Sequence, residues 1–174
     1  MNEEEIKTAV FELGAVKAPG PDGFNGIFYQ KYWEIVKEGM VQAVKGFFHG
    51  GFMLRELNRT NIVLIPKVKA PEDLTQFRPI SCCNFAYKII SKVLVNRLKP
   101  LMEELITQNQ CAFVEKRQIQ DNILVANEVF HHLKIRRRGM KYEIAIKVDM
   151  NKAYDRVEWR FVEEVMRKMG FERK

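Results

Sequence analysis

The sequence has few cysteines and no long apolar run. It contains three cysteines, Cys82, Cys83 and Cys111, none of them in a Cys-x-x-Cys pair. This spacing argues against a zinc site or a disulfide framework, so we expect buried thiols in a reducing compartment. No stretch reaches the roughly 18 apolar residues of a membrane span. The N-terminus is acidic, unlike a secretory signal, so we expect an intracellular protein without membrane contact.

Acidic residues are the minority among the charged ones. Lys and Arg total 29 against 22 Asp and Glu, which gives a net charge of +7 and favours polyanionic partners, nucleic acid first. Hydrophobic residues make up 47% of the chain, enough for a packed core and too many for a disordered protein. The length of 174 residues suits one domain of ordinary size.

Apolar residues recur at helical spacing in several segments. The first helix follows an acidic turn and would end at Gly14; its apolar positions are Ile6, Ala9, Val10 and Leu13. The same periodicity predicts helices over residues 26–48, 84–98, 119–133 and 159–169, and a shorter one from Pro100 to Ile106. Between the first two helices, Ala18–Gly23 holds two prolines and two glycines, which is typical of turns.

Two short segments have the character of strands. Thr60–Pro66 is β-branched and apolar, and the chain would leave the core at Lys67. Tyr142–Asp149 alternates, with Tyr142, Ile144, Ile146 and Val148 on one face. We therefore predict an α+β fold in which helices pack around a small sheet.

Asp149 is the sharpest candidate for chemistry. Hard divalent cations such as Mg²⁺ need oxygen ligands on rigid supports, and a carboxylate at a strand end beside a backbone carbonyl supplies them. From periodicity alone, the simpler interpretation is that Asp149 caps the N-terminus of a following helical turn.

Five blocks, in order, resemble the N-terminal part of the reverse transcriptase of LINE-type (non-LTR) retrotransposons, particularly those of plants. They are Lys17–Gly23 (Lys-Ala-Pro-Gly-Pro-Asp-Gly), Ile62–Lys67, Phe77–Leu98, Gln110–Asn122 and Lys147–Trp159. The resemblance spans nearly the whole chain, and ordered blocks are more specific than a lone motif. It implies a partial right-hand polymerase fold, with a helical extension over residues 1–58, fingers over 59–140 and the start of the palm over 141–174.

The last block carries the residues that the family uses at its metals. By this resemblance, Asp149 matches the first catalytic aspartate, which binds both Mg²⁺ ions (Mn²⁺ could substitute), and the Met150 carbonyl matches a backbone ligand. Two such ions activate the primer 3′-hydroxyl and stabilise the leaving group. Tyr154 matches the aromatic gate that excludes a ribose 2′-hydroxyl, where the family more often has phenylalanine. The alternative for Tyr154 is simple core packing.

Lys67 and Arg78 match basic residues of the fingers that hold the triphosphate of the incoming dNTP. A guanidinium suits this role because its fork meets phosphate oxygens two at a time. Pro66 and Pro79 flank the two basic residues and would stiffen their attachment. The alternative is a pair of solvated loop residues.

Further basic residues could contact nucleic acid through phosphates or could belong to solvated loops: Lys116, Arg117, Lys134, Arg136, Arg137, Arg138 and Lys141. Asp155 fits a helix N-cap, or an ion pair with Arg156 or a nearby lysine, at least as well as it fits a metal site. His131 and His132 are adjacent, which makes a shared metal improbable.

The sequence has no Tyr-Ala-Asp-Asp motif, which in the family supplies the later catalytic carboxylates. We therefore expect a truncated RNA-directed DNA polymerase, inactive alone, whose missing palm and thumb would have to come from another chain. The implied partners are an RNA template, a DNA primer and dNTPs, in the nucleus by family. The alternatives are a non-catalytic basic RNA-binding or interaction module, and a relic without a selected role. Truncation would also expose an apolar strand face and lower stability.

Overall fold

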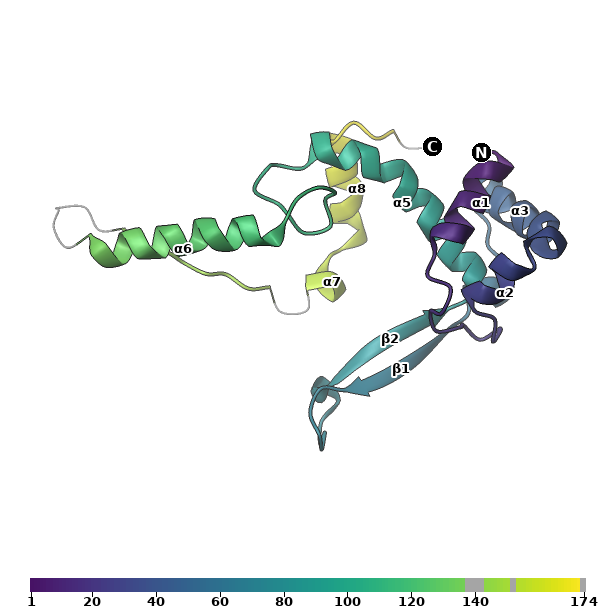
Figure 1. Ribbon diagram of the computed structural model, residues 1–174, viewed down its shortest axis with the longest axis horizontal. Coiled ribbons are helices and arrows are strands. Elements are labelled where there is room, and N and C mark those ends of the chain that lie inside the picture. The colour runs from purple at the N-terminus through teal and green to yellow at the C-terminus, as the bar shows by residue number, and fades with distance from the viewer. Residues whose placement is uncertain (137–142, 151–152, 173–174) are drawn as a thin grey trace. The chain divides into compact units, whose positions relative to one another are not determined.

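The computed structural model describes residues 1–136, 143–150 and 153–172 (Figure 1). The chain divides into two compact units, the N-terminal unit (Met1–Pro100) and the C-terminal unit (Leu101–Lys174). Within the described ranges, no helix combines the length and the apolar character needed to cross a membrane.

Helices build most of the N-terminal unit. They are α1 (Glu3–Glu12), α2 (Gly26–Lys31), α3 (Trp33–Gly50), α4 (Arg55–Asn58) and the first part of α5 (Phe85–Leu105). The Asn2 side chain caps α1 by accepting from the Glu5 amide at 2.8 Å, as asparagine commonly does before a helix. The helix predicted over residues 26–48 is two helices, because the backbone of Tyr32 (φ −106°, ψ 26°) leaves the helical range.

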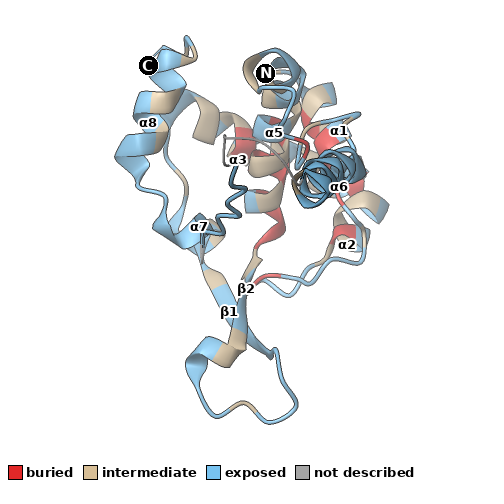
Figure 2. Ribbon diagram, turned by 90° about the vertical axis from the view of Figure 1, so that its left-hand side faces the viewer, coloured by how far each residue is buried: buried red, intermediate tan, exposed pale blue. Residues whose placement is uncertain are grey.

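The core of the N-terminal unit lies among its helices. Its largest fully buried side chains come from α1, α3 and α5: Phe85, Ile6, Ile89, Val10, Val44 and Val93. Figure 2 shows the buried residues in red, gathered in these helices. Burial of each such side chain stabilises a fold by roughly 1.5–3 kcal/mol. The periodicity of the predicted first helix and of the helix predicted over residues 84–98 therefore identified their core faces correctly.

The sheet is a single antiparallel hairpin of β1 (Thr60–Pro66) and β2 (Phe77–Cys83), and the loop between them holds the short 3₁₀ helix Leu74–Gln76. β2 was not predicted, because Pro79 disfavours a strand; with only two strands, Pro79 lies on an edge and is tolerated. The α+β class is confirmed. The predicted packing of helices around the sheet is wrong, because the strands are exposed along most of their length.

In the C-terminal unit, the end of α5 is followed by α6 (Ile119–Ile135), α7 (Ala153–Arg156) and α8 (Trp159–Lys168). Pro100 was predicted to begin a new helix, but it lies inside α5, which continues to Leu105. Proline has no backbone N–H, so one helical hydrogen bond is missing where the two units meet in sequence.

The predicted strand over residues 142–149 is wrong for the residues that the structure describes. Tyr142 lies outside them, and residues 143–150 form neither helix nor strand. Ile144, Ile146 and Val148 are 80–85% exposed. A strand needs a neighbour for its backbone hydrogen bonds, and in the described ranges this segment pairs with none. We expected the apolar side chains of this segment to be exposed, and those of Ile144, Ile146 and Val148 are exposed.

Candidate functional site

The hairpin brings Lys67 and Arg78 to its far end. In the strand register, Arg78 lies opposite Ile65, and Lys67 follows two residues after Ile65. The Lys67 amide still donates to the Gln76 carbonyl at 2.7 Å, so the ladder contact extends one step beyond β1. Because side chains two residues apart share a face of a strand, the pleat assigns Lys67 and Arg78 to one face of the hairpin.

The two basic side chains differ in their contacts. Lys67 Nζ donates to the Thr75 carbonyl at 2.9 Å, which anchors the ammonium group across the loop. The Arg78 side chain is exposed, and it forms no hydrogen bond or ion pair with any of the described residues. Its guanidinium therefore keeps its full fork of donors for a phosphate or carboxylate.

Local hydrogen bonds order the loop beside these residues. Asp73 Oδ1 accepts from the Thr75 amide at 3.0 Å, and Gln76 Oε1 accepts from the Glu72 amide at 2.8 Å. Side chains that satisfy loop amides in this way reduce the number of conformations that the loop samples. The end of the hairpin is thus a defined turn on which a cationic face is displayed.

Asp149 lies in the extended segment of the C-terminal unit. Its side chain and the neighbouring Met150 are exposed. In the described parts of the chain, no three His, Cys, Asp or Glu side chains gather as a metal site would need. A single carboxylate with a backbone carbonyl does not fit a complete Mg²⁺ site, since such sites use carboxylates together with substrate phosphates and water.

Tyr154 and Asp155 lie on the short helix α7. Tyr154 is 95% exposed, so the alternative of core packing does not hold in this structure. Asp155 lies inside α7, which excludes the helix N-cap, and no ion pair joins it to Arg156 within the described residues. The exposed Tyr154 ring is free to contact a ligand.

Arg117 has a structural position that the sequence did not reveal. Its guanidinium donates to four backbone carbonyls at the C-terminal end of α5, at 2.5–3.2 Å: those of Glu103, Ile106, Thr107 and Gln110. Carbonyls at a helix end lack intrahelical partners, and a cation there also opposes the helix dipole. This arrangement does not support the predicted nucleic-acid contact of Arg117, because the donors that would meet phosphate are in use.

The other basic candidates are partly engaged. Lys116, 78% exposed at its side chain, forms an ion pair with Glu103 at 3.3 Å. Arg136, just after α6, pairs with Glu143, and the hydrogen bond from Arg136 holds the pKa of the Glu143 carboxyl below its usual value. Lys134 is exposed. The predictions for Arg137, Arg138 and Lys141 fall outside the described residues.

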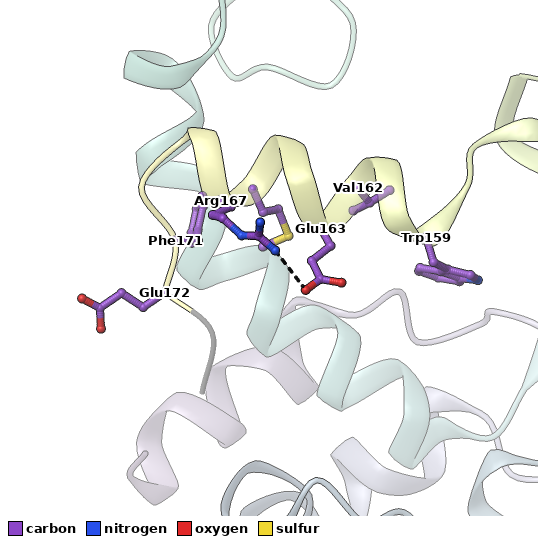
Figure 3. A pocket seen from close by; sticks show the side chains of 7 residues that line it. Trp159, Val162, Glu163, Arg167, Phe171 and Glu172 are labelled. Atoms are coloured by element: carbon purple, nitrogen blue, oxygen red, sulfur yellow. Dashed lines mark hydrogen bonds and ion pairs between the residues drawn. The ribbon is translucent and has the colours of Figure 1, made fainter.

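An open pocket of about 440 Å³ lies along α8 (Figure 3). Trp159, Val162, Met166 and Phe171 give it an apolar lining, and Arg167 bridges Glu163 and Glu164 at its side. Trp159 is 88% exposed there. The helical periodicity of residues 159–169 predicted this apolar face but not what contacts it.

Asn84 is a buried polar residue among those the structure describes, and the sequence pattern did not single it out. Asn84, between β2 and α5, is 3% exposed and bonds to backbone groups of two other segments. Its place at the first position of the helix predicted over residues 84–98 is the signal in the sequence that could have drawn attention to it.

Comparison with known proteins agrees with the ordered blocks. Residues 65–174, more than half of the chain, match the family model for reverse transcriptase (RNA-dependent DNA polymerase). The chain is 28% identical over 159 residues to the transposon TX1 uncharacterized 149 kDa protein of Xenopus laevis, covering 91% of this chain and 12% of that protein. It is 24% identical over 161 residues to a putative 115 kDa protein in type-1 retrotransposable element R1DM of Drosophila melanogaster, covering 89% and 15%.

The chain thus spans a small part of the length of these relatives, and its matches are to proteins of transposable elements. Reverse transcriptases use divalent metal ions and bind a nucleic-acid template and nucleotides. The family match and these relatives agree with the ordered blocks of the sequence. The chain belongs to the reverse transcriptase (RNA-dependent DNA polymerase) family, in its LINE-type branch.

Proposed function

We propose that the end of the hairpin binds the triphosphate of a dNTP through Arg78 and Lys67. The observation that carries the proposal is the exposed guanidinium of Arg78, without a partner in the described residues, on the face of the hairpin that Lys67 shares. Arg78 would meet two phosphate oxygens with parallel hydrogen bonds, and Lys67 would add a point charge. The hydrogen bond from Lys67 to the Thr75 carbonyl lowers the conformational entropy that is lost when this charge is held in place.

We further propose that Asp149 contributes one carboxylate, and Met150 its carbonyl, to the divalent metals of an RNA-directed DNA polymerase. In that enzyme the metals would be Mg²⁺ or Mn²⁺, and the substrates an RNA template, a DNA primer and dNTPs. Support comes from family membership and from the exposure of Asp149 in its extended segment. Tyr154, exposed on α7, would act as the sugar gate.

These 174 residues alone should not polymerise DNA, because the later carboxylates of the Tyr-Ala-Asp-Asp motif are not among them. The test is template-directed dNTP incorporation with Mg²⁺ and with Mn²⁺. We expect no incorporation. Incorporation that disappears in Asp149→Ala would contradict this proposal, since it would show a working site on the chain itself.

Nucleotide binding is tested separately from catalysis by titrating the chain with dNTP in a calorimeter. Arg78→Ala removes a pair of charge-assisted hydrogen bonds worth about 1.5–3 kcal/mol, so affinity should fall roughly 10- to 100-fold. Arg59→Ala is the matched control, because Arg59 is an exposed arginine of the same unit. Equal affinity of the Arg78 and Arg59 variants would refute the triphosphate site.

A non-catalytic RNA-binding module is the alternative function. It depends on the basic residues 134–141, so it predicts salt-dependent RNA binding and indifference to nucleotide. The pairing of Arg136 with Glu143 and the carbonyl contacts of Arg117 leave fewer free cations for RNA binding among the described residues.

We also propose a reducing, intracellular and nuclear location, which the three free thiols and the family support. The similarity to plant elements stays a prediction.

A further inference from the structure

The base of the hairpin is built around Asn84. This residue directly follows β2, and its side chain is buried at 3% exposure. Its Nδ2 donates to the Glu56 carbonyl at 2.8 Å and the Leu57 carbonyl at 3.3 Å, both on α4. Because β1 begins at Thr60, shortly after α4, the Asn84 side chain connects the start of β1 to the end of β2.

Asn84 also holds the turn segment (Ala18–Gly23). Its Oδ1 accepts from the Asp22 amide at 3.1 Å. Gly20 is packed so closely that a Cβ there would lie 2.4 Å from both the backbone nitrogen and Oδ1 of Asn84. Such a distance is far below van der Waals contact, so only glycine fits at position 20.

Two more contacts join the turn segment to the start of α5. Lys88 Nζ donates to the Ala18 carbonyl at 2.6 Å. Tyr29 donates from its hydroxyl to Asp22 and stacks on Phe85, with the ring centroids 4.5 Å apart and the planes 11° from parallel. The turn segment, Asn84 and the first turn of α5 therefore form one connected group at the base of the hairpin.

The rest of the hairpin has little other support within the N-terminal unit. Its half-buried residues are Thr60, Cys82 and Cys83 at the base and Phe77 beside the loop; the remaining strand positions are exposed. Figure 1 shows the hairpin extending away from the helices of this unit. Its direction is therefore set at the base.

We propose that Asn84 is a positioning residue that fixes the direction of the hairpin and so the place of Lys67 and Arg78. The functional part of this inference rests on the proposed triphosphate site. Seven strand residues span roughly 20 Å, so a tilt of about 10° at the base moves the far end by about 3–4 Å. A misplacement of that size separates a phosphate from its hydrogen-bond donors.

The test measures a distance within the N-terminal unit and needs no nucleotide, so its outcome is independent of the triphosphate site. Spin labels on noncanonical amino acids at Lys69, in the hairpin loop, and Gln42, on α3, report the direction of the hairpin by pulsed electron resonance. Both positions are exposed. Circular dichroism of each variant checks that the helices are retained.

Asn84→Asp keeps the acceptor for Asp22 but replaces the donor to α4 with an acceptor. We expect a distance distribution that is broader than in the wild type and shifted by a few ångströms, with the helical signal kept. Asn96→Ala is the control, because the half-buried Asn96 makes a single side-chain hydrogen bond, to Glu12. It should leave the distribution unchanged.

Lys88→Ala is the second variant, to be used if Asn84→Asp does not fold. Lys88→Ala removes one hydrogen bond to the turn segment and places a good helix former in α5. It should broaden the distribution to a smaller extent. If Asn84→Asp folds and keeps the distance distribution of the wild type, the proposal is overturned. If Asn84→Asp is unfolded, a wild-type distance distribution in Lys88→Ala overturns it.

Discussion

The N-terminal and C-terminal units treat their apolar residues in opposite ways. In the N-terminal unit, side chains of α1, α3 and α5 are buried against one another. In the C-terminal unit, Cys111 is the one buried hydrophobic residue among those described, while Trp159 and Ile146 are at least 80% exposed. Both units have amphipathic helices. The comparison therefore teaches that an apolar pattern in the sequence specifies which face of a helix is apolar, but not which other element packs on that face.

Polar contacts order the segment of the C-terminal unit between α5 and α6. Arg117 collects the carbonyls at the end of α5, and Asn122 donates to the Asn109 carbonyl at 2.9 Å while accepting a weak hydrogen bond from Cys111. Neutral hydrogen bonds of this kind contribute only about 0.5–1.5 kcal/mol each in water, and those of a charged group such as Arg117 somewhat more. We expect the N-terminal unit to be the more stable of the two.

Paired isoleucine truncations should break the comparison most clearly. Ile89→Ala removes a side chain with no exposure and should cost about 2–5 kcal/mol in the free energy of unfolding. Ile146→Ala removes an 80% exposed side chain and should change it by less than about 0.5 kcal/mol. Urea unfolding followed by circular dichroism, which reports the helices of both units, measures both losses. Equal losses would contradict the contrast between the units.

Arg117→Ala should have an intermediate effect that is confined to the C-terminal unit. The loss of charge-assisted bonds to helix-end carbonyls should cost about 1.5–3 kcal/mol locally. Hydrogen exchange of residues 106–118 should accelerate, while exchange in α1 and α3 stays unchanged. Arg160→Ala, at an exposed arginine of α8, is the control. Unchanged exchange in Arg117→Ala would show that the four carbonyl contacts do not order this segment.

The smallest effect concerns Tyr29 and alkaline pH. Burial, together with the nearby Asp22 carboxylate, raises the pKa of Tyr29 to about 12. The unfolded phenol titrates near pH 10, so the folded state binds more protons between these values. The free energy of unfolding should therefore fall as pH rises from about 10 to 12, and less so in Tyr29→Phe. Identical pH profiles for the two proteins would contradict this assignment.

The sequence predicted the elements whose signal is local. Periodicity found the helices around Ile6, Ile89 and Ile123, and β-branched residues found β1. It failed where the outcome depends on a distant partner: Pro79 hid β2, which exists because β1 lies beside it, and the alternation of residues 143–149 indicated a face without a neighbour.

The same division applies to the candidate site. The resemblance selected Lys67 and Arg78, and the hairpin register accounts for their common face. Asn84 and Arg117 act through carbonyls and amides that no side-chain pattern encodes, so their contacts emerge only from the folded chain.

The central claim is that Arg78 binds the phosphates of a nucleotide at the end of the hairpin. The most direct measurement is an NMR titration of the arginine Nε–H signals with a dNTP and, separately, with the deoxynucleoside that lacks phosphates. We predict that the Arg78 signal shifts with the dNTP alone, while the signal of Arg59 does not move. An Arg78 signal that is unchanged by the dNTP, or that moves equally with the deoxynucleoside, would contradict the account.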